Sequence, residues 1–415
     1  MSTVAFAVLC CFTFVVPWEE FITLPVIGSV AHLVGLVASA VGVFHILARR
    51  RIRPPSWFHV FAVLFVLWAG VSNFWSIDPE ATRSRFLTYL QLAALVWLIW
   101  EIAGTPERGR TLLAAYVLGA GVAAVATVYN YLSGASFDFE ATRFTALNEN
   151  PNDLGLALVL GLPMAWYLSL SQPHRRWAWA WQLYIPLGIT AILLTASRGA
   201  FLAGLVALAI VPWTLGRLRP RMKATLYACA IASLVLARSF VPAGSLERIG
   251  STRADIEAGY FGGRAAIWEA GLQVVQEHPL AGVGAGAFLA AVQPMLGIPK
   301  TSHETFLAIV VEDGLVGLLL FLAMVAAAIE PLRQLPILQR RFSIVILAVL
   351  AVASLSAGWD YHKPLWFVLG VLAAQGALRG PVSWRRAPVF EGGIGRNPGR
   401  VVRAVERPEE LAQGG

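Results

Sequence analysis

Long apolar runs recur along the chain and constrain its fold more than any other feature. About twelve of them approach the length needed to cross a bilayer, although several are short. The chain is 57% hydrophobic and only 13% charged, whereas soluble domains carry roughly 25% charged residues. We therefore predict an all-α polytopic membrane protein and exclude a soluble fold. The runs cover residues 3–16, 21–47, 57–74, 86–102, 111–132, 153–170, 177–195, 199–216, 222–238, 304–328, 341–357 and 363–378.

Arginine clusters in alternate loops predict the orientation. Positively charged loops remain in the cytoplasm, so both termini are expected there. The net charge of +8 is then explained by topology and gives no reason to expect a nucleic-acid partner. The clusters are Arg49, Arg50, Arg51 and Arg53; Arg175 and Arg176; Arg217, Arg219, Arg221 and Lys223; and Arg333, Arg340 and Arg341.

This topology divides the chain into four predicted parts. Residues 1–238 hold nine transmembrane helices, and residues 304–378 hold three more. Between them, residues 239–303 form one large external loop. Its segment Gly263 to Glu277 has helical apolar spacing, which predicts an amphipathic helix on or near the membrane surface. Residues 379–415, rich in Arg, Gly and Pro, are expected to be a disordered basic cytoplasmic tail.

The polar cluster Thr301 to Thr305 stands at the external end of the run 304–328. We expect Thr301 to cap that helix, with Glu304 completing a capping box. His303 would then lie in the first helical turn, where the helix dipole favours the neutral imidazole. A neutral histidine at this boundary is suited to act as a general base, although most lone histidines are structural.

Three arginines are expected on the same external side, which is otherwise poor in positive charge. Arg198 lies in the tight turn between two runs, Arg264 begins the amphipathic helix, and Arg143 precedes a span. Any one of them is most simply explained as contacting lipid head groups. Three together favour an anion, and guanidinium groups bind phosphate oxygens in bidentate fashion. The sequence thus predicts a phosphate or diphosphate ligand on this side.

Acidic residues near the same end of the chain have two interpretations. Glu312 and Asp313 lie inside an apolar run, where an ionisable pair suggests function by default. The alternative, which we favour slightly, is a polar contact that holds neighbouring helices together. Asp360, His362 and Lys363 lie in the last external loop and could line the same cavity as His303.

Several kinds of site are not indicated. The chain has no Walker A pattern and no HExxH or paired His/Cys ligand pattern, so we expect no nucleotide, no metal and no cofactor. Asp138 and Glu140 are the nearest approach to a metal-binding Asp-x-Asp, and we interpret them as a solvated loop. The three cysteines, Cys10, Cys11 and Cys229, lie within apolar runs, and none is placed for a disulfide or a metal.

The order of these motifs resembles the O-antigen ligase and polymerase superfamily. The resemblance covers roughly residues 140–320 and extends to the overall topology. One departure is Glu304, because the family often has Asn after the histidine. The motifs in chain order are Arg143 ahead of Asn150-Pro151-Asn152, Ser197-Arg198-Gly199, Arg264 with Trp268, His278-Pro279-Leu280 with Gly282 to Gly286, His303-Glu304, and Glu312-Asp313-Gly314 up to Gly317.

This resemblance implies a glycosyltransferase of the membrane-embedded C type (GT-C) in the inner membrane of a Gram-negative bacterium, with a periplasmic active site. The donor would be a glycan on undecaprenyl diphosphate, and the acceptor of a ligase would be lipid A–core oligosaccharide. Transfer would be inverting and metal-independent. His303 would act as base while Arg198 and Arg264 stabilise the leaving diphosphate. Substrate contacts are expected from Arg143, Asn152, Glu304, Trp268 and Asp360.

Other activities remain open. O-antigen polymerases and protein O-oligosaccharyltransferases share these motifs, and we prefer a ligase because the chain is compact. A transporter of lipid-linked glycans is less favoured. Transporters often show internal repeats and midplane charges, whereas here the polar residues gather at one face and no repeat is visible.

Overall fold

The protein is helical apart from one pair of two-residue strands, β1 (Thr23–Leu24) and β2 (Gly28–Ser29), which pair antiparallel. The computed structural model describes residues 2–19, 21, 23–24, 28–136, 143–146, 149–171, 176–240, 242–244, 247 and 264–378. Its α-helices are α1 (Ser2–Val15), α2 (Val30–Arg49), α3 (Trp57–Val71), α4 (Pro79–Ile102), α5 (Pro106–Leu132), α6 (Pro151–Ser171), α7 (Tyr184–Leu194), α8 (Arg198–Leu208), α9 (Ile210–Thr214), α10 (Pro220–Phe240), α13 (Arg264–Glu277), α14 (Phe288–Leu296), α15 (Thr305–Ile329), α16 (Ile337–Ser356) and α17 (Lys363–Gly376). Short 3₁₀ turns are η1 (Val16–Trp18), η2 (Ser72–Phe74), η3 (Ala178–Leu183), η4 (Leu215–Arg217) and η5 (Glu330–Gln334).

Eight helical segments in the described part of the chain are long and apolar enough to cross a membrane. The prediction of an all-α polytopic membrane protein is therefore confirmed. Each of the twelve apolar runs lies largely in helix. The count of twelve crossings is not confirmed, because α1, α7, α10 and α17 do not meet the same requirements of length and apolarity. The basic tail, residues 379–415, lies outside the described residues.

Local capping explains where the helices that carry the site begin. Asp78 and Thr105 cap α4 and α5, each followed by proline at the first helical position, where its missing N–H costs nothing. Ser197 caps α8 by accepting a hydrogen bond from the Ala200 amide at 3.3 Å. Arg198 is therefore the first residue of α8, at the end of the tight turn after α7.

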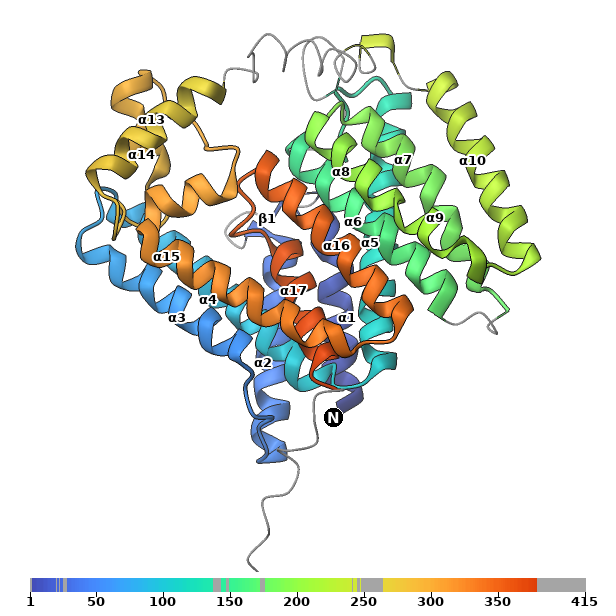
Figure 1. The fold of residues 1–415 in the computed structure, drawn as a ribbon, viewed down its shortest axis with the longest axis horizontal. Coiled ribbons are helices and arrows are strands. Elements are labelled where there is room, and N and C mark those ends of the chain that lie inside the picture. Colours follow the sequence, from blue (N-terminus) through green and yellow to red (C-terminus); the bar gives the residue numbers. More distant parts are fainter. Residues whose placement is uncertain are drawn as a thin grey trace, which may run out of the picture. The chain divides into compact units, whose positions relative to one another are not determined.

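Helix α6 forms the centre of the core. Of its most apolar stretch, 94% is buried, and it packs against α5, α7, α8 and α16 (Figure 1). Because lipid surrounds the outer helices, their exposed faces are also apolar, for example at Leu118 and Leu205. The first residues of α6, Pro151 to Asp153, project from this rigid centre toward the candidate site.

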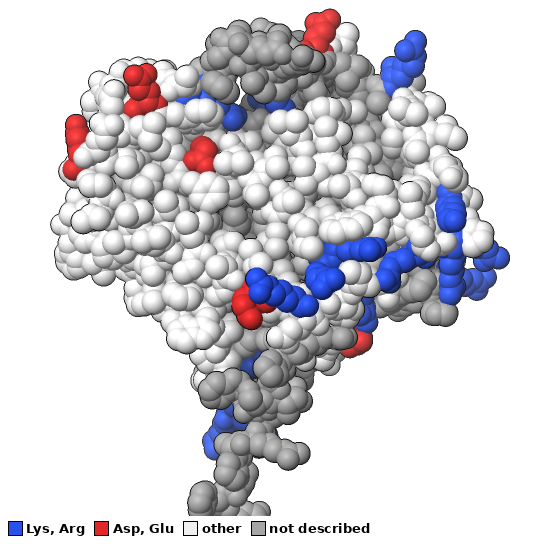
Figure 2. Space-filling view, viewed as in Figure 1, with Lys and Arg blue, Asp and Glu red and all other residues white. Residues whose placement is uncertain are grey.

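Exposed basic residues gather at one end of the helices. Figure 2 shows most of the Lys and Arg side chains on the side where α10 and α16 begin, whereas α13 and α14 lie at the opposite side of the view. Arg217, Arg221, Lys223, Arg333 and Arg340 are exposed there. This distribution agrees with the predicted positive-inside orientation.

Helix α13 confirms the predicted helix over residues 263–277. Its place on or near the membrane surface stays a prediction. Its apolar residues Ile267, Ala270 and Val274 are buried in a small core with α14 and α15, and Leu272 is 54% exposed. The helix is held by protein packing because α14 and the first half of α15 supply an apolar surface for it.

A break in α15 is the main irregularity of the fold. Gly314 has φ 68° and ψ −170°, so the helical hydrogen-bond ladder is interrupted there. The loop after α13 fills the gap. Val283 and Gly284 donate amide hydrogen bonds to the carbonyls of Val311 and Glu312 at 3.0 and 2.8 Å, and Leu315 donates to Pro279 at 2.9 Å. The backbone groups released by the break are thereby satisfied, as the membrane interior requires.

This docking explains two glycines of the motifs noted above. Gly282 and Gly314 both have positive φ, and an added Cβ would lie 2.4 Å from the Glu312 carbonyl oxygen and 2.2 Å from the Leu280 carbonyl oxygen. No side chain fits at either position without moving backbone. The segment that begins at Gly282 is thus packed closely against α15.

We predict that Gly314→Ala lowers the free energy of unfolding by at least about 3 kcal/mol, because it combines a left-handed backbone with a backbone clash. Gly297→Ala is the matched control. Gly297 also has positive φ, but in the described part of the chain its added Cβ meets no atom within 4 Å. It should cost only about 1 kcal/mol. Thermal unfolding in detergent measures both, and equal losses would contradict this account of the break.

Candidate active site

A polar cavity of about 170 Å³ lies where the ends of several helices meet. It is bounded by the start of α6, the segment before α15, the start of α14 and the turn between α16 and α17. Its polar lining includes Arg85, Asn152, Asp153, His303, Tyr361 and His362. Of the predicted site residues, His303 and Asn152 therefore line this cavity.

His303 stands outside α15, and the predicted capping box is wrong. The helix begins at Thr305, and Glu304 is its N-cap, with a side-chain oxygen that accepts from the Leu307 amide. Thr301 instead shares a 3.1 Å hydrogen bond with His303 Nε2. Glu304 alone therefore caps α15, in place of the predicted pair of Thr301 and Glu304. Its carboxylate is bound to the first turn of the helix.

The backbone of His303 is strained, with φ 51°. Such a conformation is uncommon for residues other than glycine, and it persists only when the surrounding structure enforces it. Trp268 Nε1 donates to the Ser302 carbonyl at 3.0 Å, and Thr305 Oγ1 donates to the Ala357 carbonyl at 2.8 Å. These two anchors hold the segment on both sides of His303 and fix where its ring lies.

The surroundings keep the imidazole neutral, but not for the reason expected. Burial lowers the pKa of His303 below its ordinary value, and the positive charges of Arg264 and Lys300 lower it further, while Asp153 opposes them. The helix dipole, which the sequence suggested as the cause, acts on a residue inside the first turn, and His303 lies outside it. Burial and the charge of Arg264 favour the neutral imidazole instead.

Arg198 and Arg264 interact electrostatically. Burial lowers the pKa of Arg264, and the charge of Arg198 lowers it further. Arg264 also donates from Nη1 to the Ser356 carbonyl at the end of α16, at 3.1 Å. The first residues of α8 and α13 thus carry guanidinium groups that act on each other electrostatically, and the charge of Arg264 also lowers the pKa of His303. Neither Arg198 nor Arg264 lines the His303 cavity.

Arg143 has a different role in this structure. Its Nη2 donates to Asn152 Oδ1 at 2.9 Å, and its Nε donates to the Thr195 carbonyl at 3.1 Å. It therefore ties the segment before α6 to the end of α7 and orients Asn152. Arg143 is not among the residues that line the His303 cavity.

Asp153 was not predicted as a site residue. It lies in the first turn of α6 and accepts a 3.1 Å hydrogen bond from Trp359 Nε1, and its Oδ1 lies 4.0 Å from His362 Nε2. The ring of His362 stacks on that of Trp359 at a centroid distance of 5.9 Å. The sequence signal was available, because an acidic residue directly after Asn152 begins a span on the external side.

Arg85 was also missed, and it occupies the floor of the cavity. It lies in α4 and pairs with Asp360 Oδ2 at 3.0 Å and with Glu312 Oε2 at 3.4 Å. Asp360 has no exposed surface, accepts from the Tyr89 hydroxyl at 2.6 Å, and is not among the cavity-lining residues. Asp360 thus lies beneath the cavity, where it holds Arg85.

Glu312 fits the structural interpretation that we favoured for the acidic pair. Beyond Arg85, its carboxylate accepts from the Gly286 and Phe288 amides at 2.8 and 3.3 Å, so it joins α4, α14 and α15. Asp313 differs, since neither of its carboxylate oxygens has a hydrogen-bond partner within the described residues.

Residues 183–322 match the O-antigen ligase family. The chain is also 25% identical over 321 residues to the exopolysaccharide production protein ExoQ of Rhizobium meliloti (strain 1021), which covers 68% of this chain and 66% of that relative. The chain thus spans just under two thirds of that protein's length. This match agrees with the family resemblance inferred from motif order, and the apolar helices agree with a multi-pass membrane protein.

The matched residues 183–322 supply only part of the cavity. They contribute Thr301, His303 and Glu312 to its lining, whereas Arg85, Asn152, Asp153 and His362 come from outside them. Because α4, α6 and the turn before α17 are needed to close the site, the helices on both sides of the matched residues belong to one functional unit.

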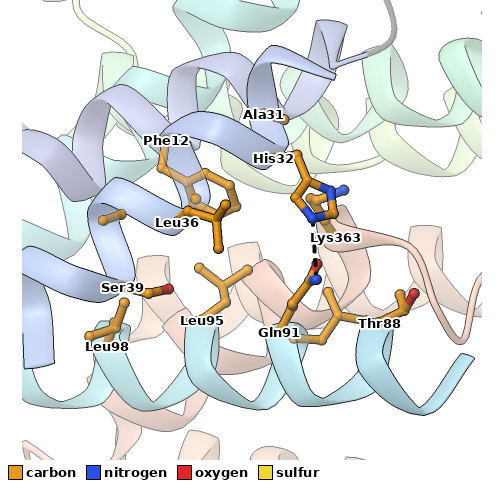
Figure 3. Close-up of a pocket in the computed structure, with 13 residues that line it drawn as sticks. Phe12, Ala31, His32, Leu36, Ser39, Thr88, Gln91, Leu95, Leu98 and Lys363 are labelled. Atoms are coloured by element: carbon orange, nitrogen blue, oxygen red, sulfur yellow. Dashed lines mark hydrogen bonds between the residues drawn. The ribbon is translucent and has the colours of Figure 1, made fainter. Parts of the chain in front are cut away.

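A second cavity, of about 60 Å³, lies between α1, α2 and α4, and Lys363 at the start of α17 also lines it. Figure 3 shows Phe12, Leu36, Leu95 and Leu98 along it, with His32 and Gln91 joined at 3.3 Å at one end. Lys363 is paired with Glu19. Its mostly hydrocarbon lining makes it unsuited to acid–base chemistry.

No group of three His, Cys, Asp or Glu side chains suited to a metal occurs among the residues that the structure describes. Asp138 and Glu140, which we interpreted as a solvated loop, lie outside them. Metal-independent chemistry accordingly stays a prediction.

Proposed function

We propose that the protein is a membrane glycosyltransferase that moves a glycan from undecaprenyl diphosphate to a hydroxyl group of lipid A–core oligosaccharide, on the periplasmic face of a bacterial inner membrane. The observation that carries the proposal is His303. It lines a polar cavity, where burial and the charge of Arg264 lower its pKa, and Arg264 is itself affected by the charge of Arg198. Neither arginine lines that cavity. A neutral base close to guanidinium charge is suited to transfer from a diphosphate donor.

The reaction would proceed by a single displacement. The acceptor hydroxyl oxygen forms a bond to the anomeric carbon while His303 takes its proton. The bond between that carbon and the diphosphate oxygen breaks, and the electron pair leaves with the diphosphate. Arg198 and Arg264 stabilise the charge that develops there. Attack opposite to the leaving group inverts the anomeric centre, and the diphosphate supplies the driving force, so no nucleotide is required at this site.

The acceptor distinguishes this proposal from its closest alternatives. A polymerase of the same superfamily would use a second lipid-linked glycan as acceptor, and a protein O-oligosaccharyltransferase would use a serine. The name of the relative ExoQ refers to exopolysaccharide production, which supports glycan assembly in general and keeps the polymerase as second candidate. A transporter accounts less well for His303, whose backbone is strained and whose segment is held by hydrogen bonds on both sides.

Transfer by the purified protein tests the function. The protein is incubated with an undecaprenyl-diphosphate glycan and lipid A–core, with and without EDTA. We expect glycan on lipid A–core in both reactions, and loss of transfer on chelation would overturn the metal-independent mechanism. In a deletion strain we expect core without O-antigen. Single repeat units still attached to core would indicate a polymerase instead.

The pH dependence of transfer should follow His303. The base must be neutral, and the lowered pKa of His303 keeps it neutral below the ordinary range of histidine. Transfer should therefore persist on acidification past about pH 6.5 and fall only at lower pH. Lys300→Gln removes a charge that lowers this pKa, so the acidic limb should move to higher pH with the plateau rate unchanged. A limb that stays in place would argue against His303 as the titrating group.

A further inference from the structure

We propose that the protein has a second binding site, for the phosphate-bearing head group of an anionic phospholipid, at the end of the helices opposite to His303. The site is a cavity of about 710 Å³ between the start of α5, the end of α6 and η3. It is lined by Arg110, Leu118, Leu168, Arg176, Trp177 and Trp181, with further small residues.

The position of this cavity separates it from the catalytic proposal. Helix α6 has 21 residues, which corresponds to a length of about 30 Å. Its first turn carries Asn152 and Asp153 at the His303 cavity, and Leu168 in its last turn lines the second site. Asn152 and Leu168 are about 24 Å apart along the helix, so most of the hydrocarbon thickness separates the two cavities. Arg176 belongs to a loop that the positive-inside rule assigns to the cytoplasm.

The polar part of the cavity favours a phosphate group. Arg110 and Arg176 both line it, so two guanidinium groups face one space. Arg110 is only partly neutralised. Its Nη2 donates to Glu107 Oε1 at 3.0 Å, but its buried Nε has no hydrogen-bond partner within the described residues. The Glu107 carboxylate is 72% exposed and uses only part of the five N–H donors of Arg110. Phosphate oxygens match the geometry of the remaining donors.

The rest of the cavity favours a lipid as the source of that phosphate. Leu118 is 56% exposed and Leu168 is buried, and together they form an apolar wall that continues along α5. Trp177 and Trp181 stand beside the arginines, and tryptophan is enriched where membrane meets water. Basic pockets between helices on the cytoplasmic side of membrane proteins bind anionic head groups. A free phosphate would use the arginines but not the wall.

Lipid binding to the full-length protein tests this site. Purified protein in phosphatidylcholine nanodiscs is titrated with phosphatidylglycerol, and bound lipid is counted by native mass spectrometry. Arg110→Gln and Arg176→Gln should each weaken phosphatidylglycerol binding about 5-fold, because one basic residue near the surface contributes about 1 kcal/mol. The double variant should weaken it about 25-fold on the same basis.

Matched variants separate the site from general charge. Arg333→Gln with Arg340→Gln removes two exposed arginines of the same side that do not line this cavity, and it should leave binding unchanged. Equal loss in both double variants would overturn the site. Glu107→Gln should maintain or strengthen binding, since it releases Nη2 of Arg110. In a separate arm, glycerol 3-phosphate that binds as tightly as the phospholipid would overturn the lipid assignment.

A measurement on the unmodified protein guards against misfolded variants. Phosphatidylglycerol with a photoactivatable group near its head should cross-link to the peptides that contain Leu118 or Trp181. Cross-links that are spread evenly over the lipid-facing helices would also overturn the proposal.

Discussion

Replacing Arg198 or Arg264 with alanine will reduce glycan transfer at least as much as replacing His303. A positioned general base supplies roughly 10²- to 10⁴-fold. Stabilisation of the charge on a leaving group supplies a similar or larger factor, and removing one such donor costs about 10²- to 10³-fold. Arg264 begins α13, and the charge of Arg198 acts on it, so the proposed mechanism assigns both guanidinium groups to the leaving diphosphate.

Steady-state transfer rates with purified variants measure these effects. Arg83→Ala and His278→Ala are the matched controls, since both side chains are exposed and neither lines the cavity. They should retain at least about half of the wild-type rate. Transfer by His303→Ala at the wild-type rate would rule out its role as base, and arginine variants that lose less than the histidine variant would show that proton removal limits the reaction.

Arg85→Met will destabilise the protein by about 3–5 kcal/mol, because it leaves the carboxylates of Glu312 and Asp360 buried without their partner. These side chains are 3% and 0% exposed, and Arg85 itself is 15% exposed. Arg85 also lies over the ring of Tyr361 at 3.8 Å, so its removal loses packing as well. The expected result is a large fall in the thermal midpoint in detergent.

Two variants make this prediction specific. Arg83→Met changes an exposed arginine two residues earlier in the same helix, and it should cost no more than about 0.5 kcal/mol. The triple variant Arg85→Met, Glu312→Gln, Asp360→Asn removes all three charges and should recover much of the lost stability. If Arg85→Met were no worse than Arg83→Met, the cluster would not hold α4, α15 and the last external turn together.

The spans could be predicted from sequence because the signal is local. A segment such as Pro151–Ser171 is apolar over its own length, and no distant residue is needed to recognise it. The break in α15 could not be predicted in this way. Gly314 lies in a long apolar run that is typical of a continuous helix, and only the loop near Gly282, some thirty residues earlier, makes the interruption stable.

The candidate site also combines residues that the local sequence predicts with residues whose role depends on distant partners. His303, Arg198 and Arg264 were found because each stands at the end of an apolar run on one predicted side. Arg85 stood at such an end too, but the boundary drawn at residue 86 placed it in a loop, away from the core. Its importance depends on Glu312 and Asp360, more than two hundred residues later. Pairing over that distance arises from packing and leaves no pattern in the local sequence.

The interruption at Gly314 also constrains how the protein is made. In lipid, a helix with unsatisfied backbone groups at its centre is too costly to exist. When α15 first enters the bilayer it must therefore be a continuous helix, or the loop from Pro279 to Gly284 must already be in place. That loop is translated before α15 and lies on the far side of the membrane in the predicted topology. In that topology, translocation of the loop precedes the final shape of α15.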